Sequence, residues 1–195
     1  MATICVFCAS SSAIPSRYVE LASEVGAEIA RRGHSLVTGG GSVSAMGAVA
    51  RAARAGGAYT VGVIPQAIMD LEIADHDADE LVVVQTMRER KGEMDARSDA
   101  FISLPGGIGT LEELLEVWTA RTLGMHSKPL VVCDPDDAYA PLRAQIDQIV
   151  ARGFARPTIH QAIAWCRTAV EAVDLAELPG PRAAPSAAEI LEADP

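Results

Sequence analysis

The chain has 195 residues, enough for one domain with a full core, and is 49% hydrophobic but only 4% aromatic, so Ala, Val, Leu and Ile must fill that core. Its formal net charge of −10 argues against a general nucleic-acid binder, which needs a basic face, and favours a small ligand in a local site. No apolar run approaches the roughly 20 residues of a membrane span, and the N-terminus lacks the basic region of a signal peptide, so no membrane partner and a cytoplasmic location are expected.

Strands and helices are predicted to alternate along the chain. In the first half we expect strands at 3–9, 35–38 and 59–64 and helices at 16–32 and 44–55. In the second half we expect strands at 81–85, 100–104, 130–133 and 159–165 and helices at 87–97, 111–121 and 139–152. Continuous apolar strands that alternate with helices indicate an α/β fold, a parallel sheet covered on both faces. We expect a single domain over residues 1–176, followed by a mobile Ala- and Pro-rich tail over residues 177–195.

Three loops of small residues follow predicted strands: Ser10–Ser12, Gly39–Gly41 and Pro105–Thr110. In open parallel sheets, ligands bind beyond the carboxyl ends of the strands, at a switch point in strand order. The three loops are therefore expected to form one pocket on that rim.

The last of these loops, Pro105-Gly106-Gly107-Ile108-Gly109-Thr110, leads from a strand into a helix. Its three glycines allow close approach of backbone to a ligand, in conformations that other residues rarely adopt. Thr110 is expected to cap the helix or to offer its hydroxyl to an anion, and free N–H groups at a helix start suit a phosphate.

The helix after Thr110 carries several acids. Leu111, Leu114, Leu115 and Trp118 have the spacing of a core-facing stripe, so Glu112, Glu113, Glu116 and Thr119 should project away from it. Compensation of the helix dipole explains one or two of these acids. A carboxylate beside a phosphate loop also suggests chemistry on a phosphorylated substrate.

The preceding helix begins Met87-Arg88-Glu89-Arg90-Lys91, again after a strand. Arg90 offers a planar fork for phosphate or ribose oxygens, and Lys91 offers a point charge. Cations at a helix start oppose the macrodipole, so this placement hints at function; the alternative is a solvated face.

Other chemistries have weaker support. The first strand ends in serines, without the Gly-x-Gly-x-x-Gly of dinucleotide-binding folds, which counts against a dehydrogenase. Cys5-x-x-Cys8 has no second pair, and the four histidines lack metal spacing, so no metal site is expected. Neither lysine, Lys91 or Lys128, has a context that marks a Schiff-base residue.

Taken together, Met87-x-x-Arg90-Lys91, Pro105-Gly-Gly-x-Gly-Thr-x-Glu-Glu113 and Gly39-Gly-Gly resemble the LONELY GUY (LOG) family, whose members are cytokinin riboside 5′-monophosphate phosphoribohydrolases. The resemblance runs from about Ile4 to Trp165 and includes Gly62-Val-Ile-Pro65 and Leu123-Gly-x-His-x-Lys-Pro129. It implies a Rossmann-like doubly wound sheet, a homodimer, no cofactor, and hydrolysis of the N-glycosidic bond of an adenine-type nucleotide monophosphate. The label lysine decarboxylase, often given to such proteins, is not supported by these residues.

The resemblance also implies roles for particular residues. The family's catalytic arginine and glutamate fall on Arg90 and Glu113. The substrate-binding positions, taken from the family and from the loop, are Glu72, Met87, Lys91, Gly106, Gly107, Ile108, Gly109, Thr110, Leu111, Glu112 and Thr119.

Two positions depart from the family pattern. Ser44-Ala45-Met46-Gly47 stands where Gly-Leu-Met-Gly is usual, and Arg88 stands where histidine is common. Both departures concern substrate preference more than the reaction, because neither touches Arg90 or Glu113.

Cleavage at C1′ develops positive charge on the ribose, which a carboxylate can stabilise while it orients or deprotonates water. We assign this role to Glu113, ribose or phosphate contacts to Arg90, and the 5′-phosphate to residues 107–110. The competing hypothesis is a non-catalytic nucleotide-binding or cofactor-carrier protein on the same fold, which fold alone does not exclude.

Overall fold

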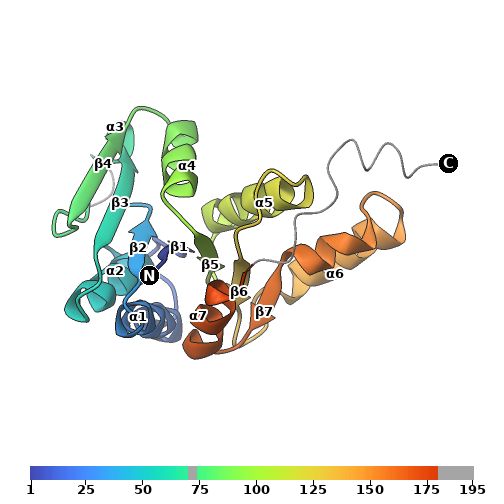
Figure 1. Cartoon of the computed structure of the whole chain (residues 1–195), viewed down its shortest axis with the longest axis horizontal. Coiled ribbons are helices and arrows are strands. Elements are labelled where there is room, and N and C mark those ends of the chain that lie inside the picture. The colour runs from blue at the N-terminus through green and yellow to red at the C-terminus, as the bar shows by residue number, and fades with distance from the viewer. Residues whose placement is uncertain (70–73, 180–195) are drawn as a thin grey trace.

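The computed structural model describes residues 1–69 and 74–179. It contains one parallel sheet of seven strands in the order β4-β3-β2-β1-β5-β6-β7. The strands are β1 (Thr3–Phe7), β2 (Ser35–Thr38), β3 (Thr60–Pro65), β4 (Glu80–Val84), β5 (Ala100–Ser103), β6 (Leu130–Cys133) and β7 (Ala164–Cys166). The chain builds outward from β1 to β4 and then returns to the other side of β1, so β1 and β5 form the switch point (Figure 1).

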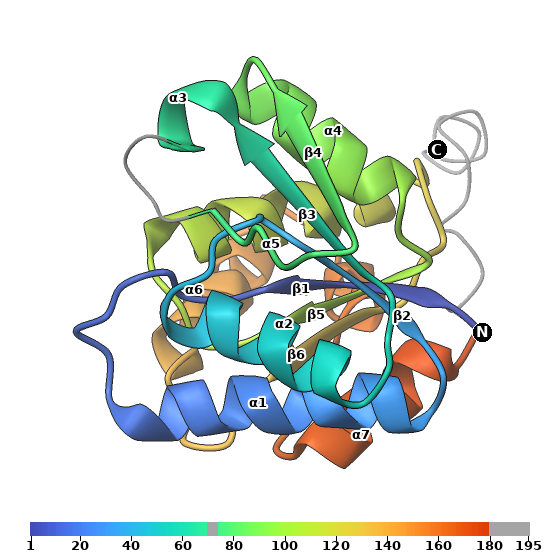
Figure 2. The ribbon, with the colours of Figure 1, turned by 90° about the vertical axis from the view of Figure 1, so that its left-hand side faces the viewer.

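The helices are α1 (Ser16–Arg31), α2 (Ser44–Ala55), α3 (Gln66–Met69), α4 (Met87–Ala96), α5 (Ile108–Thr122), α6 (Ala140–Ala151) and α7 (Ala169–Glu177), with a 3-10 helix η1 (Pro157–Ala162). They form two layers that enclose the sheet, which confirms the doubly wound α/β prediction (Figures 1 and 2).

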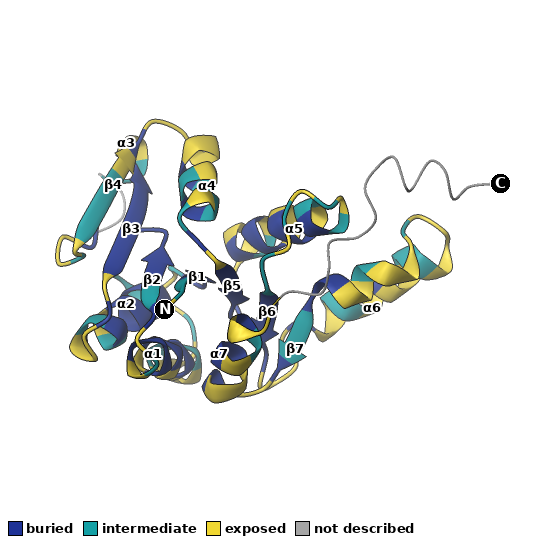
Figure 3. Cartoon of the chain, viewed as in Figure 1, coloured by how far each residue is buried: buried dark blue, intermediate teal, exposed yellow. Residues whose placement is uncertain are grey.

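Alternate residues of each strand face the two layers. In β1, Ile4 and Val6 belong to the core beneath α1, α2 and α7, whereas Cys5 and Phe7 belong to the core shared with α4, α5 and α6. The edge strands β4 and β7 are only partly buried, whereas the five strands between them are buried on both sides (Figure 3). This is why the strands are continuous apolar runs in the sequence.

Small residues let α1 and α2 pack closely. A Cβ added to Gly26 of α1 would lie 2.2 Å from the Val49 carbonyl oxygen of α2. The alanine-rich sequence of α2 thus serves helix packing, which compensates for the scarcity of large aromatic side chains.

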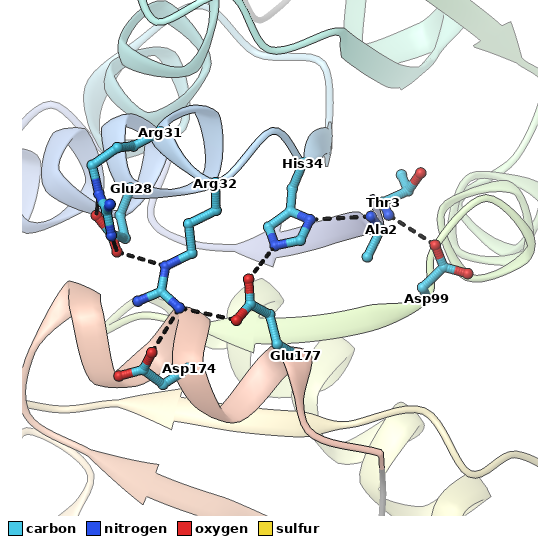
Figure 4. Close-up of polar contacts among 9 residues, drawn as sticks. All are labelled: Ala2, Thr3, Glu28, Arg31, Arg32, His34, Asp99, Asp174 and Glu177. Atoms are coloured by element: carbon cyan, nitrogen blue, oxygen red, sulfur yellow. Dashed lines mark hydrogen bonds and ion pairs between the residues drawn. The ribbon is translucent and has the colours of Figure 1, made fainter.

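The amino ends of the strands carry a cluster of charged side chains that joins α1 to α7 (Figure 4). Glu28 binds Arg31 and Arg32, and Arg32 also reaches Asp174 at 2.6 Å and Glu177 at 2.9 Å. Glu177, placed by the sequence at the start of the tail, is the last residue of α7.

The expected strand at 159–165 is wrong for most of its length. Pro157 begins the 3-10 helix η1, and only Ala164–Cys166 pair with β6. The apolar residues of η1 pack under α5, where the Trp118 indole donates to the Ile159 carbonyl oxygen at 3.0 Å. This contact between helices, which the sequence pattern does not reveal, overrides the local strand propensity.

Helix α7 was not predicted from the sequence. Its start has a capping box in which Thr168 and Glu171 exchange side-chain and backbone hydrogen bonds. Its buried residues, Ala169, Ala172, Val173 and Ala176, have helical spacing. Both signals are present in the sequence.

Candidate active site

A cavity of about 610 Å³ lies at the switch point, beyond the carboxyl ends of β1 and β5. The loops after β1, β5 and β6 line it, together with residues of α2, α4 and α5. Its volume is in the range of small-ligand sites. The loops that contain Ser10–Ser11 and Pro105–Thr110 therefore line one cavity, as expected. Gly39–Gly41 is not among the lining residues, and the Gly39 carbonyl oxygen instead accepts a hydrogen bond from Arg90.

The glycine loop, residues 105–110, forms one wall of this cavity. Helix α5 begins at Ile108 with Gly107 at its N-cap, so the expected capping role of Thr110 is wrong. Thr110 is buried in the first turn instead. The backbone N–H groups at residues 107–110 have no partner within the helix and can bind an anion.

The glycines of this loop provide space, and none of them has a positive φ, contrary to the sequence expectation. A Cβ on Gly106 would lie 2.2 Å from Thr110 Oγ1. A Cβ on Gly107 or Gly109 would meet no protein atom within 4 Å. The two latter glycines thus keep room for a ligand beside the helix start.

Arg90 reaches the cavity from α4 and is buried. Its Nε donates to the Val63 carbonyl oxygen at 3.1 Å and its Nη2 to the Gly39 carbonyl oxygen at 3.1 Å. A Cβ on Gly39 would lie 1.7 Å from Nη2, so the glycine turn after β2 is shaped around this guanidinium. A third donor, Nη1, lies 3.3 Å from Glu113 Oε1, which leaves two N–H bonds for a ligand.

Glu113 lies on the buried side of α5, contrary to the expectation that it projects away from the core. The buried residues of α5 include Thr110, Glu113, Leu114, Val117 and Trp118, whereas Leu115, expected in the core, is 39% exposed. The helix is therefore turned so that this carboxylate faces Arg90 and the cavity.

Burial controls the protonation of Glu113. Desolvation raises its pKa to about 7, although the Arg90 cation acts in the opposite direction. A carboxyl group with a pKa near neutrality can accept and release protons at physiological pH.

The remaining predicted site residues divide between the cavity and the outer face of α5. Met87, Gly106, Gly107, Ile108, Gly109 and Thr110 line the cavity with Arg90 and Glu113. Lys91, Leu111, Glu112 and Thr119 lie on the outer side, where Lys91 binds Glu112 and, at 2.7 Å, Glu116. Glu72 falls outside the described residues. The helical twist separates residues that are adjacent in sequence.

Ser44, the first departure from the family pattern, has a φ of 53°. That left-handed conformation favours glycine, which explains why glycine is usual there. The Ser44 hydroxyl donates to the Ser11 carbonyl oxygen at 2.6 Å and so ties α2 to the rim of the cavity.

Sequence reasoning missed some cavity residues. Cys8, Tyr18 and Tyr139 line the same cavity as the glycine loop. No sequence motif marks them, because they lie on different elements and meet only in the folded chain. Burial raises the pKa of Cys8 far above its usual range, which keeps the thiol protonated.

Several further features bear on the ligand class. Within residues 1–69 and 74–179, no helix combines the length and apolarity needed to cross a membrane. The same part of the chain holds no cluster of three or more His, Cys, Asp or Glu side chains that could bind a metal ion. Lys91 pairs with Glu112 and Glu116, and Lys128 pairs with Asp95 at 2.9 Å.

Residues 46–176 match the family model described as "Possible lysine decarboxylase". The cytokinin riboside 5′-monophosphate phosphoribohydrolase of Mycobacterium tuberculosis is 56% identical over 83% of this chain and 86% of its own length. The enzyme of that name from Arabidopsis thaliana, LOG3, is 45% identical over 87% of this chain and 79% of its own.

Solved structures resemble the fold at lower identity. The molybdenum cofactor binding protein of Rippkaea orientalis superposes with a TM-score of 0.69 at 20% identity, covering 89% of this chain and 94% of that one. The molybdenum cofactor carrier protein of Chlamydomonas reinhardtii gives a TM-score of 0.65 at 19% identity, covering 89% and 94%. At this identity the likeness concerns the fold alone.

Proposed function

The chain belongs to the family of cytokinin riboside 5′-monophosphate phosphoribohydrolases, the LOG family, and from this premise we propose that it hydrolyses the N-glycosidic bond of such nucleotides and of AMP. The products are the free base and ribose 5-phosphate. The reaction consumes one water, whose oxygen bonds to C1′, while the base leaves with a proton.

The observation that carries this proposal is the buried Arg90–Glu113 pair beside an anion-binding helix start. A phosphate site alone explains binding. A carboxyl group with a pKa of about 7, held in the same cavity, adds the means to do chemistry on the bound nucleotide.

In the proposed mechanism, the 5′-phosphate accepts hydrogen bonds from the N–H groups at residues 107–110, and the two remaining N–H bonds of Arg90 hold ribose oxygens. This fixes C1′ near Glu113. As the bond to the base breaks, the Glu113 carboxylate stabilises the positive ribose and takes a proton from the attacking water.

The predicted site residues on the outer face of α5 lie where a second copy of the chain could bind. Lys91, Glu112 and Thr119 lie beside exposed Leu123 and Met125 on the outer face of α5. We propose that this apolar face mediates a homodimer, since large exposed apolar patches mark protein contacts. Light scattering should give twice the monomer mass for the wild type and a monomer for Met125→Glu. We also propose that the protein is located in the cytoplasm.

The first test incubates the protein with AMP, isopentenyladenosine monophosphate, adenosine or ATP and follows release of free base by chromatography. We expect the monophosphates to react and adenosine to react poorly, because adenosine lacks the phosphate anchor. ATP should fit worse, since the loop lacks the Gly-Lys-Ser/Thr ending of triphosphate sites. Tight binding of AMP without base release would favour the non-catalytic carrier alternative.

Gly107→Val tests the phosphate site. Gly107 has a φ of −84°, and its added Cβ meets no protein atom, so the variant should fold normally. Its side chain fills the space assigned to the phosphate. Ribose 5-phosphate should inhibit the wild type competitively and lose its affinity for this variant; equal affinity would place the phosphate elsewhere.

A further inference from the structure

The turn at residues 134–139 follows β6 and lies against the glycine loop. Asp137 in this turn has a φ of 59°, a strained conformation for a residue other than glycine. Such strain persists only where surrounding contacts hold the backbone in place.

Two carboxylates hold this turn. The Asp134 side chain is fully buried and accepts hydrogen bonds from the backbone N–H groups of Ala138 at 2.8 Å and Tyr139 at 3.0 Å. Both Asp137 oxygens lie within 2.9 Å of Arg167 Nη2, a side chain from beyond β7. The carboxyl ends of β6 and β7 are thereby linked.

The turn aims Tyr139 at the glycine loop. Its hydroxyl donates to the Leu104 carbonyl oxygen at 2.7 Å, and Leu104 directly precedes Pro105. The ring is 5% exposed and packs edge-on against Trp165, with 6.4 Å between centroids. Burial is the main cause that raises the pKa of this phenol to about 12, so the hydroxyl stays protonated and remains a donor.

The Leu104 backbone is buried between β1 and the turn, so solvent does not readily replace a lost partner of its carbonyl oxygen. Leu104 is 1% exposed, and its N–H already donates to the Phe7 carbonyl oxygen of β1 at 2.9 Å. Without the phenol, the buried carbonyl oxygen loses this partner, and the loop must shift to regain one.

We infer that Tyr139 is a positioning residue that fixes the glycine loop in the geometry needed to bind the substrate phosphate. This inference rests on the proposed function for the identity of the substrate, but its contacts are those of the protein alone. The side chain acts through the loop backbone and needs no contact with the reacting atoms.

Tyr139→Phe removes only the hydroxyl, and Tyr59→Phe is its control, because Tyr59 is 51% exposed and lies outside the cavity. We expect Tyr139→Phe to raise the KM for AMP about tenfold and to keep kcat within about twofold. Calorimetry should show ribose 5-phosphate binding weakened by the same factor, with adenosine affinity unchanged. The control should match the wild type.

An unchanged KM, or equal weakening toward adenosine and ribose 5-phosphate, would overturn the inference. A wild type that binds ribose 5-phosphate but does not cleave AMP would defeat the proposed function alone, and the calorimetric comparison would still decide the role of Tyr139. A wild type that binds no ribose 5-phosphate would overturn both.

Discussion

Two carboxylates with the same exposed fraction, 8%, lie at opposite ends of the sheet, and their pKa values move in opposite directions. Glu28, at the amino ends, has its pKa lowered to about 2, chiefly by hydrogen bonds from Arg31. Glu113, at the carboxyl ends, has its pKa raised to about 7 by burial. Exposure alone therefore does not determine the state of a carboxyl group.

The pKa values differ because desolvation is the largest cause for Glu113, whereas hydrogen bonds from Arg31 outweigh desolvation for Glu28. Glu28 accepts three guanidinium hydrogen bonds of 2.6–2.7 Å from Arg31 and Arg32 (Figure 4). Glu113 has one contact with Arg90, at 3.3 Å, and that guanidinium also serves two carbonyl oxygens. The short hydrogen bonds from Arg31 and Arg32 keep Glu28 ionised, where it serves the structure. The single longer contact with Arg90 does not offset the desolvation of Glu113, so Glu113 can exchange a proton near neutral pH.

Glu113→Gln should give the largest effect. The amide keeps the shape but can neither take a proton from water nor stabilise the charge on the ribose, so AMP hydrolysis should fall about a hundredfold or more. Steady-state kinetics on a variant that retains the wild-type circular dichroism spectrum provides the measurement. Turnover near that of the wild type would remove Glu113 from the mechanism.

Gly39→Ala should rank second. Its Cβ would overlap Arg90 Nη2, so the guanidinium must move and kcat/KM for AMP should drop roughly tenfold or more. Gly92→Ala is the matched control, since its Cβ meets no atom within 4 Å and alanine favours the helix. Equal activity of the two variants would show that the position of Arg90 is unimportant.

The structure changes the stability expected for an Arg90→Ala variant. A cation at a helix start contributes little to stability. The buried Arg90 has three protein partners, so Arg90→Ala should reduce both stability and turnover.

Glu28→Gln should affect stability and leave catalysis unchanged. Loss of the charged partner of Arg31 and Arg32 should reduce the free energy of unfolding by about 1–3 kcal/mol at neutral pH. Because the pKa of Glu28 is lowered on folding, its contribution is present above the unfolded value of about 4.5 and is lost as the pH falls toward 2. Urea unfolding at pH 7 and pH 3 should show the difference shrinking, with kcat/KM at pH 7 equal to the wild-type value.

Glu177→Gln should have the smallest effect. Its carboxylate is half-exposed and binds Arg32 at 2.9 Å and His34 at 2.7 Å. His34 Nδ1 accepts a hydrogen bond from the Ala2 N–H, so Nε2 is the protonated nitrogen and donates to the Glu177 carboxylate. The side-chain amide oxygen of glutamine can accept the same hydrogen bond. We expect a loss below about 1 kcal/mol in thermal unfolding; a larger loss would mean that this exposed pair supports the fold as strongly as Glu28 does.

The sequence predicted the alternation of strands and helices and the cavity rim, because continuous apolar runs and glycine loops are local features. It did not predict that Glu113 faces inward, since Leu115 gives the same helix an alternative apolar stripe. That choice depends on how Val117 and Trp118 of α5 pack into the core between the helix and the sheet. Tyr139 could not be predicted, because its partner at Leu104 lies 35 residues away in the chain.

The contrast between the two ends of the sheet depends most directly on the protonation of Glu113. Carbon-13 labelling of glutamate side chains allows each carboxyl group to be titrated by NMR, with the Glu113 resonance assigned by its absence in Glu113→Gln. A midpoint near pH 7 for Glu113, beside a Glu28 resonance that stays ionised down to the lowest pH at which the protein is folded, is the predicted result. A Glu113 midpoint at or below 4.5 would contradict it, because the group would then be fixed as a carboxylate by Arg90 and the two ends of the sheet would not differ.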